Sequence, residues 1–140
     1  MPCAKILIVD DSAEVREFCR MILGDKYELA FATSGDEADE RLAADKPDLI
    51  LLDIYLPRVD GLMLAEKYKA NPELSHIPIV MMSGLMADSY LPGGFWKMAT
   101  PAQGYLHKPV EPAVLLAEVE RQLASARGID TSDNQTGGYL

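Results

Sequence analysis

The sequence predicts an α/β protein in which a parallel sheet carries helices on both faces. Three observations support this fold class. Short apolar runs alternate along the chain with segments of helical periodicity. The first, third and fourth runs are almost continuously apolar, as strands covered on both faces must be. Right-handed connections through helices are the usual way to join parallel strands in such an alternating order.

Five apolar runs are predicted to be strands. They are short and rich in aliphatic or aromatic side chains, which suits strands of a buried sheet. The runs are KILIV (5–9), YELAF (27–31), DLILL (48–52), IPIVMM (77–82) and GYLH (104–107).

Helices are predicted over residues 12–23, 34–45, 61–70 and 111–126. Gly24 suits the end of the first helix. Ser34, with Glu37 three residues later, forms a capping-box pattern at the start of the second. The Asn-Pro pair at 71–72 ends the third helix, and Pro112 stands near the first turn of the last.

Two segments have no clear periodicity. Residues 84–103 include LPGGFWKMATPAQ, whose prolines and glycines make it a poor helix former. Trp96 within it is interpreted as a core anchor, with an interface residue as the alternative. Residues 127–140 lack apolar periodicity. We therefore expect one domain over residues 1–125, followed over 126–140 by a flexible tail or the start of a linker.

The composition excludes several classes of protein. The 140 residues have a formal net charge of -9, which argues against direct binding to nucleic acid or to anionic membranes. Cys3 and Cys19 are too few for a disulfide framework or a zinc site and are interpreted as small apolar residues. No apolar run approaches the ~20 residues that cross a bilayer, and the N-terminus is unlike a signal peptide. We expect a reducing, cytoplasmic setting.

Polar side chains follow four of the five predicted strands. Asp10 and Asp11 follow the first strand, Asp53 the third, Ser83 and Gly84 the fourth, and Lys108 and Pro109 the fifth. In doubly wound sheets, ligands bind beyond the carboxyl ends of the strands. The sequence therefore predicts that these groups share one site.

Carboxylates gathered at one place persist only if some keep their protons or a cation lies among them. Three carboxylates within ~5 Å repel by about 3 kcal/mol per pair at an effective dielectric near 20. Mg²⁺ usually takes one or two protein carboxylates and leaves room for a phosphoryl oxygen. Ser83, backbone N–H groups near Gly84 and the Lys108 ammonium can stabilise a transferring phosphoryl group. An aspartate beside the metal can itself be the nucleophile and form an acyl phosphate.

Each of these residues also has an ordinary structural explanation. Asp11 or Ser12 alone suits the N-cap of the next helix. Ser83 alone suits a turn, and Lys108 before Pro109 suits an exposed loop. Their occurrence at successive strand ends of one sheet favours the functional interpretation.

The motifs ILIVDDS, PDLILLDIYLPRVDG, IPIVMMSG and GYLHKPV resemble the receiver domain of two-component response regulators over about residues 4 to 125. The resemblance implies the flavodoxin-like (βα)5 fold with strand order 2-1-3-4-5. It implies that Asp53 is the phosphoacceptor, with a phosphohistidine of a sensor kinase or phosphotransfer protein as donor. It also implies that Asp11, Asp53 and the Tyr55 carbonyl bind Mg²⁺ or Mn²⁺ directly, with Asp10 acting through water.

The same resemblance assigns the remaining residues. Ser83, Gly84 and Lys108 contact the phosphoryl group, and the Lys108–Pro109 peptide bond is cis. Ser83 and Tyr105 form a switch that reshapes the face of the fourth helix, fifth strand and fifth helix. That face is expected to act on a downstream partner or output module, or to form a homodimer on phosphorylation. No output domain follows residue 125, so the chain is either a stand-alone receiver or the first module of a longer protein.

Some positions depart from the family. Tyr55 and Leu85 lie two residues after Asp53 and Ser83, where water would approach, so we expect a long-lived phosphorylated form. Asp39 and Arg41 stand on the second helix where the family is often apolar, and the sequence gives no functional reason for them.

Two other functions remain as alternatives to a phosphoryl-accepting signalling switch, which catalyses only its own phosphorylation and dephosphorylation. One is a pseudo-receiver, a binding module that signals without phosphate. Such domains tend to lose the acidic pair or the acceptor, and this chain keeps both. The other is a phosphohydrolase of the haloacid-dehalogenase type, which places a second aspartate where this chain has Tyr55.

Overall fold

The computed structural model describes residues 3–84 and 102–126. The predicted weak segment, with Leu85 and Trp96, and the predicted tail lie outside those residues, apart from Gly84, Ala102, Gln103 and Ala126 at their borders. The helices are α1 (Ala13–Leu23), α2 (Gly35–Ala44), α3 (Gly61–Ala70) and α6 (Pro112–Ala126). The strands are β1 (Lys5–Val9), β2 (Glu28–Ala32), β3 (Leu49–Asp53), β4 (Tyr55–Leu56), β5 (Val59–Asp60), β6 (Ile79–Ser83) and β7 (Gly104–His107).

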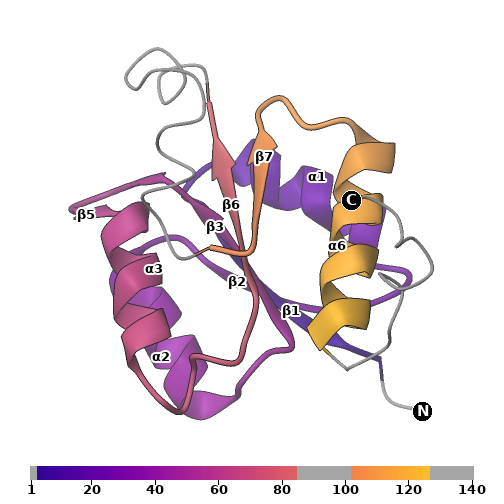
Figure 1. Cartoon of the computed structure of the whole chain (residues 1–140). Coiled ribbons are helices and arrows are strands. Elements are labelled where there is room, and N and C mark those ends of the chain that lie inside the picture. The colour runs from indigo at the N-terminus through magenta and orange to yellow at the C-terminus, as the bar shows by residue number, and fades with distance from the viewer. Residues whose placement is uncertain (1–2, 85–101, 127–140) are drawn as a thin grey trace, which may run out of the picture.

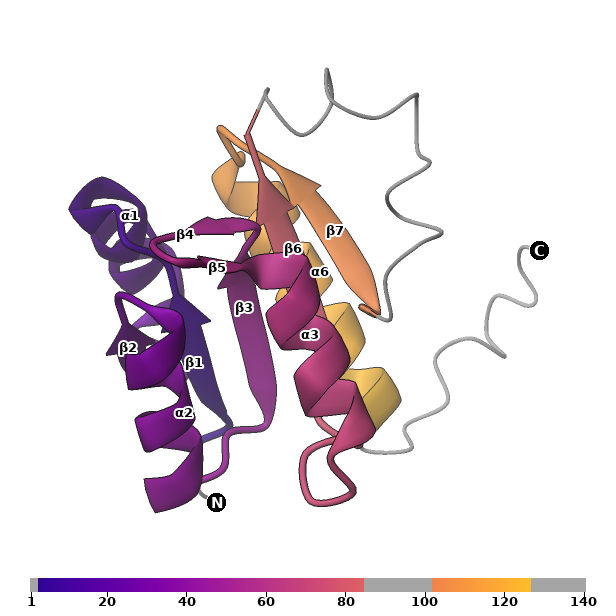
Figure 2. The same cartoon turned by 90° about the vertical axis from the view of Figure 1, so that its left-hand side faces the viewer.

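The main sheet confirms the predicted fold class. Its five strands are all parallel and lie in the order β2-β1-β3-β6-β7, which is 2-1-3-4-5 when only the strands of this sheet are counted. Helices α2 and α3 cover one face, and α1 and α6 cover the other (Figures 1 and 2). The described strands begin within two residues of the predicted runs. No helix within residues 3–84 or 102–126 has both the length and the apolar character needed to cross a membrane.

Alternate residues of the central strands fill two separate cores. Leu7, Ile50 and Ile79 point toward α2 and α3, whereas their neighbours Ile6 and Leu51 point toward α1 and α6. Side chains alternate between the faces of a strand, so a run that is apolar at every position requires cover on both faces. The strands β1, β3 and β6 are almost completely buried, as the continuous runs predict.

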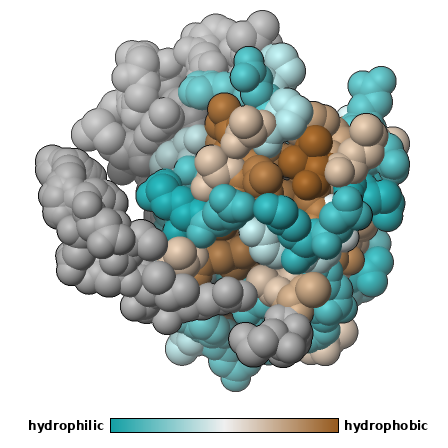
Figure 3. Space-filling view, turned by 90° about the vertical axis from the view of Figure 1, so that its right-hand side faces the viewer, coloured by the Kyte–Doolittle hydropathy of each residue, from teal (hydrophilic) through white to brown (hydrophobic). Residues whose placement is uncertain are grey.

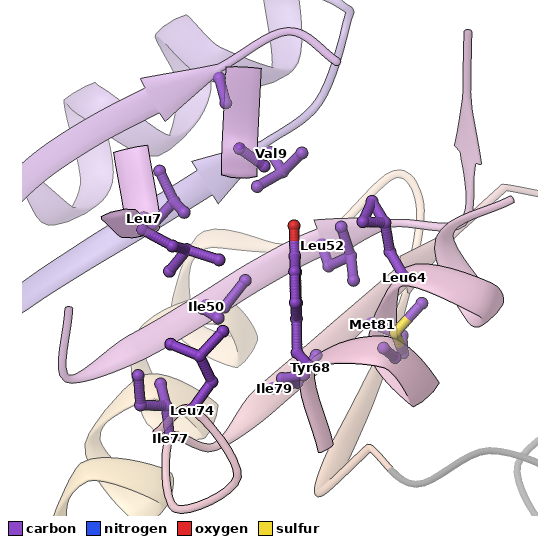
Figure 4. Packing of buried hydrophobic residues seen from close by; sticks show 14 of the residues in the cluster. Leu7, Val9, Ile50, Leu52, Leu64, Tyr68, Leu74, Ile77, Ile79 and Met81 are labelled. Atoms are coloured by element: carbon purple, nitrogen blue, oxygen red, sulfur yellow. The ribbon is translucent and has the colours of Figure 1, made fainter. Parts of the chain in front are cut away.

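A tyrosine in the first core explains one of the unusual polar positions on the second helix. The Tyr68 ring lies among Ile50, Leu52 and Ile79 (Figure 4). Its hydroxyl donates a 2.8 Å hydrogen bond to Asp39 of α2, which also accepts a 2.7 Å bond from Lys67. Asp39 therefore gives the buried phenol an acceptor and links α2 to α3.

The other unusual position protects the edge of the sheet. Arg41 Nε of α2 donates a 3.0 Å hydrogen bond to the Phe31 carbonyl in β2. Strand β2 is an edge strand of the main sheet, and its outward carbonyls need partners outside the ladder. Arg41 thus has a structural role at this position.

The helix termini match the prediction with two differences. Ser12 and Ser34 are the N-caps of α1 and α2 and accept bonds from Val15 N–H and Glu37 N–H. Glu37 Oε1, however, accepts from the N–H and the hydroxyl of Thr33 and not from Ser34, so the reciprocal contact is displaced by one residue. Gly24 caps α1 with right-handed backbone angles, so its freedom to adopt positive φ is not used.

A short antiparallel hairpin after β3 is absent from the prediction. Strands β4 and β5 pair through Tyr55 with Asp60 and Leu56 with Val59, and Arg58 in the turn has a positive φ of 66°. Gly61 follows directly. A Cβ atom there would lie 2.2 Å from the Asp53 carbonyl oxygen, so only glycine lets α3 begin so close to the end of β3.

Candidate functional site

The sheet brings the polar strand ends to one edge. Asp53 is the last residue of β3 and Ser83 the last residue of β6, while Asp10 and Lys108 directly follow β1 and β7. These strands are neighbours and parallel, so their carboxyl ends lie side by side (Figures 1 and 2). The prediction that these residues share one site follows from this strand order, and the structure places them together.

Three carboxyl groups form a cluster that could hold a metal ion. Asp10, Asp11 and Asp53 each offer one oxygen, and these oxygens all lie within 4.8 Å of one another. Asp10 and Asp53 are 0% and 4% exposed, whereas Asp11 is exposed. Oxygen ligands with one side open to water are the donor set that Mg²⁺ prefers, so these residues fit that ion.

Lys108 supplies a cation to the two buried carboxylates. Its Nζ lies 2.7 Å from Asp10 Oδ2 and 3.2 Å from Asp53 Oδ1. Burial alone lowers the pKa of Lys108, but the hydrogen bonds and charges of the two aspartates outweigh it and raise the pKa above its ordinary value. Lys108 therefore remains charged at neutral pH and offsets the repulsion between the carboxylates.

The Asp53 carboxyl group holds its proton more tightly than an exposed aspartate. Burial, followed by the charge of Asp10, raises the pKa of Asp53 to about 6, although Lys108 and the Tyr55 backbone N–H both oppose the rise. A raised pKa is common where carboxyl groups are arranged for chemistry. A bound cation would favour the ionised form.

Ser83 carries a buried hydroxyl that the described residues leave unsatisfied. Among them, Ser83 Oγ has no hydrogen-bond partner, and the residue is completely buried. Such a group normally has a reason, because an unmade buried hydrogen bond costs about 1–3 kcal/mol. A phosphoryl oxygen beside Asp53 is an acceptor of the right kind. Around Gly84, the next residue, the described part of the chain has no atom within 4 Å of an added Cβ position.

The remaining predicted site residues lie in the hairpin after β3, in β7 and directly after β7. Tyr55 is 47% exposed in the hairpin after Asp53. The Lys108–Pro109 peptide bond is cis. Tyr105 is half-buried, packs against the core on the α2 and α3 side, and donates a 3.4 Å hydrogen bond to the Ala102 carbonyl.

A cavity that the sequence does not predict lies beside the cluster. The cavity has a volume of about 540 Å³ and reaches from α1 to the loop before α6, on the side of the molecule shown in Figure 3, where apolar side chains gather. Val15 and Phe18 of α1 face Val110 and Leu115 across it, and Lys108 and Tyr55 stand at the end nearest the carboxylates. The helical periodicity of α1 indicates that Val15 and Phe18 lie on its apolar face. Whether they line a cavity depends on how far α6 lies from them, which the sequence does not show.

Comparisons with known proteins agree with this geometry. The family model described as "Response regulator receiver domain" matches residues 6–120. The chain is 35% identical over 117 residues to "Response regulator PleD" of Caulobacter vibrioides, covering 83% of this chain and 25% of that protein. It is 33% identical over 124 residues to "Phosphate regulon transcriptional regulatory protein PhoB" of Rhizobium meliloti, covering 88% of this chain and 53% of that protein.

Solved structures give the same result. A crystal structure of a putative response regulator from Chloroflexus aurantiacus aligns with a TM-score of 0.79 and 32% identity, over 87% of this chain and 98% of that one. A signal receiver domain of a histidine kinase from Syntrophus aciditrophicus aligns with a TM-score of 0.78 and 29% identity, over 88% and 92%. The chain spans about a quarter to a half of the length of the two curated relatives named above.

Proposed function

Because the chain belongs to the response regulator receiver domain family, we propose that it is a signalling switch in which Asp53 accepts a phosphoryl group from a phosphohistidine. One observation carries the proposal. A buried aspartate with two further carboxyl groups, a cationic lysine and an unsatisfied serine hydroxyl converge at one edge of the sheet. The two carboxylates of an acidic pair alone would suffice to bind a cation. The lysine and the serine therefore need a further explanation.

The proposed reaction is a direct phosphoryl transfer. A carboxylate oxygen of Asp53 attacks phosphorus, the phosphorus–nitrogen bond to the donor imidazole breaks, and its electron pair stays on that nitrogen. The leaving imidazole carries a proton on its other ring nitrogen, so the products are an aspartyl phosphate and a neutral histidine. In this proposal, Lys108 and the Ser83 hydroxyl interact with the equatorial oxygens of the phosphoryl group as those oxygens gain charge. Stabilising this charge is what accelerates such transfers.

The acidic cluster would hold Mg²⁺, or Mn²⁺ in its place. Asp11, Asp53 and the Tyr55 carbonyl are the proposed direct ligands, and Asp10 would act through water. A bound divalent cation offsets the charge of the carboxylates and of the incoming phosphoryl group. Asp10 already makes a short contact with Lys108, which supports an indirect role for it.

Phosphorylation is proposed to act through Ser83 and Tyr105. A phosphoryl group adds charge and acceptor oxygens that favour one of two arrangements of nearby elements. The reshaped face would include β7 and α6 and would act on a downstream partner, an output module or a second copy of the chain. The predicted fourth helix of that face lies outside the described residues.

The proposed donor is a sensor histidine kinase or a histidine phosphotransfer protein. The apolar cavity between α1 and α6 reaches Lys108, so a protein surface seated there would place its histidine near Asp53. A net charge of -9 disfavours direct contact with nucleic acid or anionic membranes, and the proposed setting is cytoplasmic. The two curated relatives named above are longer than this chain, so an output module in the same polypeptide also belongs to this proposal.

The test is direct phosphorylation in vitro. We expect a single phosphoryl adduct, recorded by intact mass, when the protein is incubated with acetyl phosphate and Mg²⁺, and no adduct when the metal is chelated. Beryllofluoride should bind to the same site and shift the amide resonances of residues 53–55 and 83–84. A folded protein that shows neither response would be a phosphate-independent binding module, and the proposal would fail.

Mg²⁺ binding should depend on pH. The pKa of Asp53 is raised to about 6, so the group is protonated below that pH and must lose its proton to bind the cation. We expect Mg²⁺ affinity to be constant above about pH 7 and to fall toward tenfold per pH unit below about pH 6. Calorimetric titrations across this range check the prediction, and an affinity that is equal at both ends would contradict it.

The raised pKa of Asp53 affects the stability of the metal-free protein in the opposite direction, because stability falls as pH rises whereas Mg²⁺ affinity increases. A raised pKa means that the folded state binds the proton more tightly than the unfolded chain, so this stabilisation is complete below about pH 3.8 and is lost as pH rises through about 6.

Tyr55 should prolong the lifetime of the phosphorylated form. Its side chain stands beside Lys108 at the end of the cavity, where water would approach Asp53. We expect Tyr55→Asn to lose its phosphoryl group about 3- to 10-fold faster than the natural protein, because a smaller polar side chain admits and orients water. Decay of the adduct after removal of the donor measures this. Tyr27→Asn, a change of the same chemistry far from the site, is the control and should decay at the natural rate.

A further inference from the structure

Every polar group of Asp10 has a partner before any ligand binds. Its N–H donates a 3.0 Å bond to the Ala32 carbonyl, and its Oδ1 accepts a 2.9 Å bond from Ser12 N–H. Its Oδ2 accepts from Lys108 Nζ at 2.7 Å, and its carbonyl oxygen accepts from Arg16 Nη1 at 3.0 Å. Three of these partners have roles already described, since Ala32 is in the sheet, Ser12 is the N-cap of α1 and Lys108 is the cation of the site.

The fourth partner, Arg16, fills a position that the sheet leaves empty. The N–H and C=O of a residue in a parallel strand point toward the same neighbouring strand, and the Asp10 N–H points to β2. The paired residues of β1 and β2 end at Val9 and Ala32. The Asp10 carbonyl therefore lies beyond the ladder and needs a donor from elsewhere.

The carbonyl that Arg16 binds is part of the peptide group joining Asp10 to Asp11. A peptide group is planar, so fixing its oxygen fixes the orientation of the bonds that leave it toward both residues. Asp10 is also held by its other contacts, whereas the Asp11 side chain is exposed. Arg16 is therefore placed to set the direction in which Asp11 leaves the sheet.

We propose that Arg16 is a positioning residue, which orients the Asp10–Asp11 peptide so that the two carboxylates converge with Asp53 on one cation. The inference rests on the proposed function, since it concerns the same metal site. Arg16 itself would touch neither the cation nor the phosphoryl group.

The position of Arg16 on α1 supports a specific role. It is the fourth residue of the helix, and its N–H donates to the Ser12 carbonyl at the N-cap. A cation near a helix N-terminus is opposed by the helix dipole, and α1 begins at Ala13, only three residues before Arg16. The bond to the Asp10 carbonyl gives a reason for a charged side chain there.

Mg²⁺ affinity distinguishes positioning from simple charge. If Arg16 acts only through its charge, removing it should strengthen Mg²⁺ binding, because one repelling cation is lost. If it positions the acidic pair, removing it should weaken binding. We expect Arg16→Met to weaken Mg²⁺ binding by roughly tenfold, the value of one charge-assisted hydrogen bond. Arg16→Lys keeps the charge but lacks the planar fork, and it should recover part of the loss.

The experiment is a calorimetric Mg²⁺ titration of the natural protein, Arg16→Met and Arg16→Lys, with Arg20→Met as the matched control. Arg20 lies one turn further along α1, bonds to Glu17 and stacks on the Phe31 ring, away from the carboxylates. We expect Arg20→Met to bind Mg²⁺ as the natural protein does. Thermal unfolding in chelator records the stability of each variant separately, and Arg16→Lys decides the matter if Arg16→Met does not fold.

The outcomes separate this inference from the proposed function. Equal or tighter Mg²⁺ binding by Arg16→Met, or an equal loss in Arg20→Met, would overturn the positioning role while leaving the phosphoryl switch intact. If Arg16→Met does not fold, natural affinity in Arg16→Lys would overturn it as well. A natural protein that binds no Mg²⁺ would overturn the proposed function and this inference with it.

Discussion

Asp53→Asn is expected to remove the phosphoryl adduct completely. The amide has almost the shape of the carboxylate but lacks the nucleophilic oxygen, so incubation with acetyl phosphate and Mg²⁺ should leave the mass of the variant unchanged. The change should not harm the fold. Burial raises the pKa of Asp53 to about 6, so the group is mostly ionised at neutral pH and its buried charge destabilises the fold. A neutral amide should therefore raise the free energy of unfolding of the metal-free protein.

Stability and chemistry therefore change in opposite directions in this variant. Intact mass measures the adduct, and chemical denaturation in chelator measures the free energy of unfolding. Asp36→Asn is the control, because Asp36 is an exposed carboxylate in the first turn of α2, and this variant should be phosphorylated normally. An adduct that persists in Asp53→Asn would assign the phosphoacceptor to another residue.

Lys108→Met is expected to slow phosphorylation by about 100-fold without weakening Mg²⁺ binding. The ammonium lies 3.2 Å from Asp53 Oδ1, where it can meet the developing charge of the phosphoryl group, and removing one such donor typically costs about 100- to 1000-fold. Lys108 also occupies the carboxylates that would bind the metal. Its removal should therefore leave Mg²⁺ affinity unchanged or raise it.

The same variant should be less stable when the metal is absent. Asp10 is completely buried and would lose its nearest cation, and an unpaired buried charge costs about 3–5 kcal/mol. Mg²⁺ should restore part of that loss. Lys69→Met is a suitable control, since Lys69 is also half-buried but bonds to the Ser75 and Ile77 carbonyls away from the site. A Lys108→Met variant with the natural rate would remove the lysine from the chemistry. Lys108→Arg, which keeps the cation, supports the comparison if Lys108→Met does not fold.

The fold could be predicted from the sequence because its signals are local. Runs such as KILIV and DLILL show by composition that both faces of the strand are covered, and Ser12, Ser34 and Pro112 mark helix starts. The β4–β5 hairpin was missed because it has only two residues in each strand and a turn with Arg58 at positive φ, which no glycine signals.

The members of the site could also be predicted, but their contacts could not. Polar residues at successive strand ends identify Asp10, Asp53, Ser83 and Lys108, because parallel strands bring those ends together. Nothing in the sequence indicates that Lys108 lies closer to Asp10 than to Asp53. That order depends on side-chain conformation and on the spacing between β1 and β7.

The polar residues of the second helix show a related limit. Asp39 and Arg41 read as unexplained charges in the sequence, and their partners Tyr68 and Phe31 lie on other elements. Arg16 is a third example, because its acceptor is a backbone carbonyl that every residue possesses. Long side chains that bond to the backbone leave no pattern in a sequence.

The contact between Lys108 and Asp10 joins residues 98 positions apart, and this separation has a consequence for the newly made chain. A ribosome adds about 5–20 residues per second, so Lys108 is made roughly 5–20 s after Asp10. During that interval the emerging chain contains the carboxylates of β1 and then β3 without the lysine that neutralises them. Burial of Asp10 is thus favourable only after β7 has been synthesised, which makes the last strand of the sheet the step that completes the site.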